Sequence, residues 1–96
     1  MYAVIFRATV AKLDEEYATQ AAALRQTALT EYGCLEFVSV AEGEQEIAIS
    51  YWPSEEAIKQ WRSDPQHKIA QSNGKNRWYR DYKVEVVEIT RQYQFP

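Results

Sequence analysis

Cysteine and histidine are almost absent from this chain of 96 residues, which contains one of each. The single cysteine, Cys34, cannot form a disulfide within the chain. We expect it to be a buried structural thiol, because it follows Gly33 at the head of an apolar run. One histidine and one cysteine are too few for the usual zinc or iron sites. The sequence therefore predicts neither an internal disulfide nor a metal centre.

Glycine and long hydrophobic runs are also scarce. The chain has three glycines, none of them in a GxGxxG or Walker pattern, so nothing indicates a phosphate loop for a nicotinamide or nucleotide cofactor. We expect no bound cofactor, with reduced flavin supplied by a separate protein as the alternative. The opening residues MYAVIFRATV contain neither a basic leader nor an apolar run long enough for a membrane span. We therefore expect no membrane contact and a cytoplasmic location.

The chain as a whole has no excess of positive charge. Its net charge is −3, which argues against a nucleic-acid partner. Basic residues do gather between positions 59 and 83, where two aspartates accompany Lys59, Arg62, Lys68, Lys75, Arg77, Arg80 and Lys83. We interpret this stretch mainly as a solvated helix face, with attraction of an anionic small molecule as the alternative.

The sequence divides into segments with the patterns of strands and helices. Runs rich in β-branched and aromatic residues predict strands, and capping residues followed by apolar spacings of three and four predict helices. In chain order these are a strand in 1–10, a helix in 14–32, a hairpin in 34–52, a helix from Ser54 that breaks at Asp64 and Pro65 and ends at Asn73 and Gly74, and a long strand in 78–95. This order predicts an α+β protein of the ferredoxin-like βαββαβ type, with an antiparallel sheet covered by helices on one face.

Both faces of that sheet carry apolar side chains, as Val4 and Ile5 illustrate by pointing to opposite sides of the first strand. Because helices cover only one face, another surface has to cover the second. The simplest candidate is the same face of a second copy. We therefore expect a homodimer formed by sheet-to-sheet packing, a dimeric α+β barrel, in which the last strand reaches across and ends near Tyr93 and Phe95.

Rings and polar side chains occur together in residues 61–82, WRSDPQHKIAQSNGKNRWYRDY. This segment contains the single histidine, two of the three tryptophans and two of the seven tyrosines. A close-packed interior would explain the rings but not the polar residues, and a solvated surface would explain only the polar residues. A pocket wall explains both, so we predict that this segment lines a small-molecule site.

The stretch ISYWPSEEAIKQW, the histidine that follows it and the later RWY resemble the antibiotic biosynthesis monooxygenase family. The resemblance covers nearly the whole chain and implies that residues 1–96 form a single domain of this type. It also implies a pocket in each subunit between the helices and the sheet. The family includes quinone-forming monooxygenases, heme-degrading enzymes, isomerases and members without known activity, so the resemblance specifies the fold better than the reaction.

Two residues are candidate catalytic groups, because the resemblance implies that both point into the pocket. His67 lies in the first helical turn after Pro65, where the positive helix end favours the neutral ring that accepts a proton. Trp61 can stack on a flat substrate and donate its indole N–H to an oxygen. The alternative for each is a purely structural role.

Five further residues are candidate contacts for a small aromatic ligand: Arg7, Tyr51, Gln71, Asn73 and Trp78. A charge such as Arg7 in an apolar strand requires a partner, either a carboxylate of the protein or an anionic ligand. Tyr51 and Trp52 face opposite sides of their strand, and we expect Tyr51 to face the pocket. Gln71 shares the helix face of His67, whereas Asn73 lies near the helix end.

Together with these residues, the resemblance implies a cofactor-independent monooxygenase that acts on a small aromatic or quinol-type substrate. Such chemistry needs a base, donors that stabilise the substrate anion and a site that excludes water. A dimeric module that binds a small molecule without catalysis is the main alternative. A heme-degrading enzyme is the weaker one, because the histidine ligand of the heme-degrading relatives aligns with Gln71 and their first-strand asparagine with Phe6 and Arg7.

Overall fold

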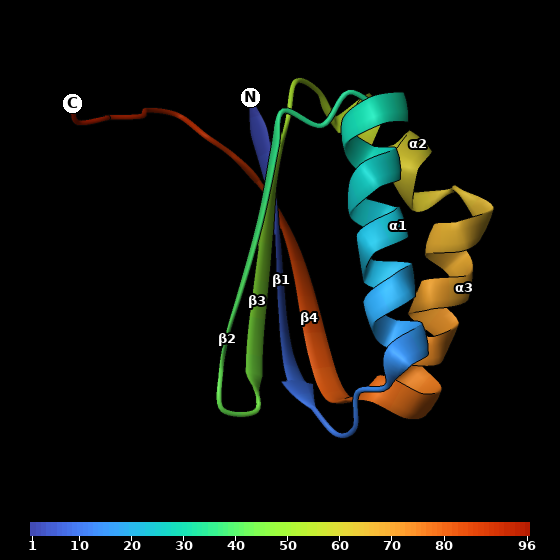
Figure 1. Cartoon of the computed structure of the whole chain (residues 1–96). Helices are drawn as coiled ribbons and strands as arrows, with labels where there is room; N and C mark the ends of the chain where they lie inside the picture. The colour runs from blue at the N-terminus through green and yellow to red at the C-terminus, as the bar shows by residue number, and fades with distance from the viewer.

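Four antiparallel strands form the single sheet of the computed structural model, which describes residues 1–96 (Figure 1). The central strand β1 pairs with β3 on one side and with β4 on the other, which gives the order β2-β3-β1-β4. The strands are β1 (Tyr2–Val10), β2 (Glu36–Glu42), β3 (Gln45–Trp52) and β4 (Tyr79–Glu88). With the helices that connect them, they confirm the predicted α+β, ferredoxin-like fold.

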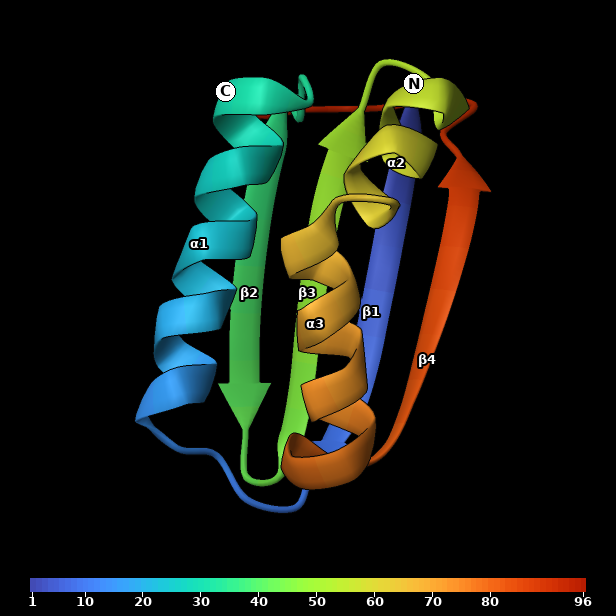
Figure 2. The ribbon, with the colours of Figure 1, turned by 90° about the vertical axis from the view of Figure 1, so that its right-hand side faces the viewer.

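All three α-helices cover the same face of the sheet, which we call the inner face (Figure 2). They are α1 (Glu15–Glu31), α2 (Glu55–Arg62) and α3 (Pro65–Asn73). Figure 1 shows the opposite, outer face without any element of the chain packed across it. No helix is long and apolar enough to cross a membrane.

The break between α2 and α3 occurs where the sequence predicts it. Asp64 caps α3 by accepting a hydrogen bond from the backbone N–H of Gln66 at 2.8 Å, and Pro65 occupies the first helical turn. The Tyr32 hydroxyl donates to the other carboxylate oxygen of Asp64 at 2.8 Å. The break is therefore fixed to the end of α1, and it places His67 at the beginning of α3.

The helix α3 ends at Asn73, as the sequence predicts, but the chain then forms the π-helical turn η1 (Gly74–Trp78) before it enters the last strand. Gly74 has a right-handed helical φ of −58°, so it does not adopt the left-handed conformation that often makes glycine necessary at a helix end. A Cβ at this position would lie 3.1 Å from Cδ2 of Tyr79. The glycine therefore allows the Tyr79 ring to pack closely against the turn.

The last strand is shorter than the sequence predicts, since β4 ends at Glu88 rather than near Phe95. Glu88 pairs with Tyr2, the first residue of β1, so no partner strand remains beyond it. The terminal residues instead leave the sheet and project from its outer face (Figure 1). Tyr93 and Phe95 are 87% and 97% exposed.

The core is concentrated around Trp52 at the end of β3. This side chain is completely buried, and its indole N–H donates to the Ser50 hydroxyl at 2.8 Å. Trp61, Ile58 and Cys34 belong to the same buried cluster. Burial raises the pKa of the Cys34 thiol, as a structural cysteine requires.

Candidate functional site

The helices and the inner face of the sheet enclose a cavity of about 380 Å³, which we call the inner cavity. The sheet forms its floor, and α1, α2, α3 and η1 contribute its walls. Most of its lining side chains are apolar, and its volume falls within the range of roughly 300–1,000 Å³ typical of small-ligand sites. The residues that carry its chemistry are Phe6, Glu46, Trp61, His67, Gln71 and Tyr79.

Strand alternation decides which side chains form the floor. Val4 and Phe6 line the inner cavity, so Arg7 points to the outer face, where it is exposed. It lies there beside Asp81 and Lys83 in a second, shallower hollow. The expected contact between Arg7 and a ligand in the pocket is therefore corrected: the structure places this side chain on the wrong side of the sheet.

The same alternation corrects the expectation for Tyr51. Tyr51 pairs with Ala3 on the outer face, whereas Trp52 pairs with Tyr2 and faces the helices. Trp52 does not line the inner cavity; it packs behind Trp61, with ring centroids 5.1 Å apart. Neither member of the pair contacts the space that a ligand would occupy.

Trp61 and His67 form a pair at one end of the inner cavity. Their ring centroids lie 4.4 Å apart with an interplanar angle of 77°, an edge-to-face contact. Trp61 is 6% exposed and is wedged between His67, Trp52 and Phe37. Packing in the core therefore determines the position of the Trp61 indole, and contact with the indole restricts the orientation of the His67 imidazole.

One polar atom of each ring is buried without a hydrogen-bond partner, namely Nε1 of Trp61 and Nδ1 of His67. Buried polar atoms in proteins are nearly always paired, so these two require a ligand or water. An indole N–H only donates, while an unprotonated imidazole nitrogen accepts. A donor and an acceptor on two rings in contact are complementary to a hydroxyl group, which can accept one hydrogen bond and donate another.

Burial, assisted by the positive charge of Arg62, lowers the pKa of His67 to about 4, against an opposing influence from Asp64. The ring is therefore neutral at pH 7, as its expected role as a proton acceptor requires. Of the seven basic residues between positions 59 and 83, Arg62 alone lines the inner cavity. Arg77 in η1 is instead held by Asp14, at 2.6 Å, and by Glu16.

The position of His67 predicts an unusual titration that can be observed without assignment, because the chain has no other histidine. We expect its ring protons to titrate in NMR spectra with a midpoint near pH 4. Between pH 4 and about 6.5 the unfolded state binds more protons than the folded state, so stability rises with pH over this window. This contribution is complete above pH 6.5 and is lost as the pH falls towards 4.

Denaturant unfolding at several pH values, with His67→Phe as the comparison, measures this effect. Between pH 4 and 6.5, the free energy of unfolding should rise by at most about 3 kcal/mol more in the wild type than in His67→Phe. The carboxyl groups contribute equally to the pH dependence of both proteins. A midpoint near 6.5, with the same pH dependence in the two proteins, would place the ring in solvent.

The three remaining candidates differ in their access to the inner cavity. Gln71 lines it, one turn after His67. Asn73 does not, and its amide donates to Oε1 of Gln20 at 3.2 Å, which joins α3 to α1. Trp78 lines the cavity, but its N–H donates to Asp14 at 3.2 Å, so only its ring is available to a ligand.

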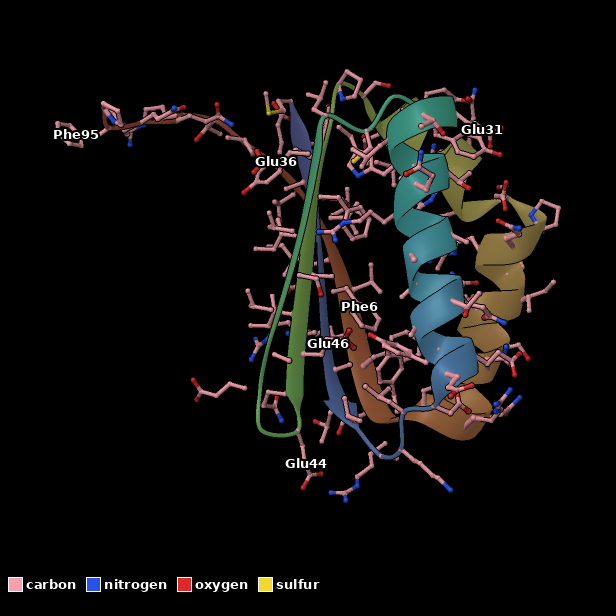
Figure 3. The ribbon with its side chains drawn as sticks, viewed as in Figure 1. Phe6, Glu31, Glu36, Glu44, Glu46 and Phe95 are labelled. Carbon is pink, nitrogen blue, oxygen red and sulfur yellow. The ribbon has the colours of Figure 1, made fainter.

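Sequence reasoning missed a second polar group of the inner cavity, formed by Glu46, Tyr17 and Tyr79, which we call the Glu46 cluster. Glu46 is 8% exposed and projects from β3 towards the helices (Figure 3). The Tyr17 hydroxyl donates to Oε1 of Glu46; burial and this hydrogen bond raise the pKa of Tyr17 to about 12. Burial and hydrogen bonding to Tyr17 raise the pKa of Tyr79.

A signal for Glu46 was present in the sequence. Glu46, Ala48, Ser50 and Trp52 alternate along β3 and therefore share the inner face. A tryptophan at the end of such a series indicates the buried side, so the glutamate of the same series should also point inward.

The family model for antibiotic biosynthesis monooxygenases matches residues 1–73 of the chain. The uncharacterized protein YqjZ of Bacillus subtilis (strain 168) is 36% identical over 95 residues, which span 98% of this chain and 83% of YqjZ. In sequence, the likeness therefore extends over nearly the whole chain.

Solved structures show the same fold at low sequence identity. A mutant of SnoaB, a cofactor-independent oxygenase from Streptomyces nogalater, matches with a TM-score of 0.78 and 13% identity, covering 95% of this chain and 94% of that one. PA3566 from Pseudomonas aeruginosa matches with a TM-score of 0.74 and 17% identity, covering 94% of each chain.

Proposed function

The chain belongs to the antibiotic biosynthesis monooxygenase family, and on that premise we propose that it is a cofactor-independent monooxygenase acting on a phenol or hydroquinone in the inner cavity. The observation that carries the proposal is the buried donor and acceptor of Trp61 and His67, which have no partner in the protein. They match a phenolic hydroxyl, and the apolar floor suits its ring. The likeness to SnoaB, itself a cofactor-independent oxygenase, supports the same reaction class.

Binding would place the substrate hydroxyl against the edges of both rings, at Nε1 of Trp61 and Nδ1 of His67. It accepts a hydrogen bond from Nε1 of Trp61 and donates its proton to Nδ1 of His67. The low pKa of His67 keeps the ring neutral in the empty cavity. In the complex the phenolate opposite the imidazolium raises that pKa, because an adjacent opposite charge favours the protonated ring. The indole N–H then stabilises the oxyanion in a site of low polarity.

The phenolate is electron-rich enough to transfer electrons to O₂. With a hydroquinone, one oxygen atom enters the ring and the other leaves as water with two of the substrate's hydrogens, which yields a hydroxylated quinone. The substrate supplies all four electrons that O₂ accepts, so the step requires no external reductant. The role of His67 is to remove and return the phenolic proton, and that of Trp61 is to hold the oxygen.

The proposal treats residues 1–96 as one domain of this family. The family model ends at residue 73, and β4 follows it to complete the sheet by pairing with β1. It also includes a homodimer formed through the outer face. Support comes from the apolar side chains that this face exposes, among them Val38 at 39%, Val40 at 66% and Val87 at 37%.

Oxygen consumption with a panel of hydroquinones tests the proposed reaction. We expect uptake of one O₂ per substrate, with one atom of ¹⁸O₂ retained in the product and the other released as water. Flavin or metal should not be needed in the assay. Tight binding of hydroquinones without oxygen uptake by any of them would instead identify a binding module without catalysis.

A further inference from the structure

Glu46 is a buried acid without a cation. Its carboxylate is 8% exposed and forms no salt bridge, while Oε1 accepts the Tyr17 hydroxyl and Oε2 has no partner. The titratable groups beside it are Tyr17 and Tyr79. A buried polar atom without a partner costs free energy, and Glu46 is one of the residues that line the inner cavity, from which a ligand could supply that partner.

The Glu46 cluster lies at the opposite end of the inner cavity from Trp61 and His67. Trp61 packs against Trp52, which is six residues after Glu46 in the same strand. Six residues of strand span roughly 20 Å at about 3.3 Å per residue, so the two polar groups lie towards opposite ends of β3. The floor between them is apolar and includes Ala48 and Phe6 (Figure 3).

We propose that the inner cavity is a two-ended site, in which Glu46 accepts a hydrogen bond from a second hydroxyl at the far end of an elongated aromatic substrate. The preferred ligand is then a flat aromatic diol with its hydroxyls at opposite ends. This inference rests on the proposed function for the end at Trp61 and His67, and it adds a specificity determinant at the other end.

The donor that fits is a hydroxyl rather than an ammonium group. The atom without a partner at this end is a single acceptor, Oε2 of Glu46, while the Tyr17 hydroxyl is already used by Oε1. A hydroxyl brings one donor to that acceptor. An ammonium group brings three donors, and beyond Oε2 the aromatic rings of Phe6, Tyr79 and Tyr82 offer the other two only ring faces.

Calorimetric titration without oxygen separates this inference from the reaction. The probes are 2,6-dihydroxynaphthalene and 2-naphthol, which differ only in the second hydroxyl. We expect the wild type to bind the diol about tenfold or more tightly than the mono-ol, as a hydrogen bond to a charged acceptor provides. In Glu46→Gln this preference should fall, because the amide carries no charge and, with its oxygen accepting from Tyr17, presents an NH₂ donor where the carboxylate presents the acceptor Oε2.

Two controls complete the experiment. Glu42→Gln makes the same change on an exposed residue of β2 and should keep the preference for the diol. His67→Phe should weaken both probes alike, because it alters the end that they share. Thermal unfolding of each variant verifies the fold, and the comparison of the two probes in the wild type needs no variant.

Three results would overturn the two-ended site. Equal affinity for both probes in the wild type would show that the cavity binds only one hydroxyl of the ligand. The proposed function would then still hold. Tighter binding of 6-(aminomethyl)-2-naphthol than of the diol would assign the Glu46 end to a cation. Failure of every probe to bind would reject the inner cavity as a phenol site and the proposed function with it.

Discussion

Replacement of His67 by alanine should lower the rate of oxygen uptake by about 10²- to 10⁴-fold, the usual contribution of a positioned proton acceptor. His67 is the only histidine of the chain, and among the cavity residues its Nδ1 is the buried nitrogen free to accept a proton. The loss should appear in kcat, with a smaller change in KM. The reason is that proton removal occurs after the aromatic ring has bound to the apolar floor.

The matched control is Lys68→Ala, which changes the next residue of α3 on its exposed side. It should retain oxygen uptake within a factor of about two, since surface substitutions away from a site have small effects. A folded His67→Ala protein with full activity would remove the proton acceptor from the proposed reaction. Activity that returns on addition of imidazole would support the acceptor role directly.

The double substitution Val38→Asp with Val40→Asp should convert the proposed dimer to monomers. Both valines lie on the outer face of β2 and are exposed in the single chain, so the change disturbs the subunit itself very little. In a two-fold interface it introduces four carboxylates that would be buried without partners. Each such charge costs several kcal/mol, so the dissociation constant should rise at least about 10³-fold.

Sedimentation velocity over a range of protein concentrations measures this change. Ile69→Asp is the control, because Ile69 is 56% exposed on α3, on the helical side of the molecule. It should leave the dimer unchanged. A wild-type protein that sediments as a monomer at all concentrations, or a double variant that remains dimeric, would reject the outer face as the interface.

Local signals predicted most of the fold. Asp14, Ser54 and Asp64 each cap a helix where the sequence places a start. The end of β4 was wrong because it is set by a distant partner, the first residue of β1, with which Glu88 pairs. The π-helical turn η1 after α3 was not predicted, because it depends on how the Tyr79 ring packs against Gly74.

The candidate site was harder to predict, because a residue's place in a strand does not show which face of the sheet its side chain is on. Arg7 and Tyr51 were chosen for their chemistry, yet each lies one residue from a side chain that faces the helices. A shift of one residue moves a side chain to the other side of a sheet. Glu46 was missed for the same reason, although it shares the face of Trp52.

Asn73 and Trp78 also differ from the predicted ligand contacts, because their N–H groups bond to residues far away in the sequence. The Asn73 amide donates to Gln20, 53 residues away, and the indole N–H of Trp78 donates to Asp14, 64 residues away. No pattern local to residues 61–82 contains this information. His67 was easier to place, because the predicted helix break at Asp64 determines the face of α3 on which it lies.

A crystal structure of the protein with 2,6-dihydroxynaphthalene, grown without oxygen, tests the central claim most directly. We predict the ligand in the inner cavity, with one hydroxyl oxygen about 3 Å from both Nδ1 of His67 and Nε1 of Trp61. A ligand bound elsewhere, or bound in the cavity without contact to this pair of atoms, would contradict the account.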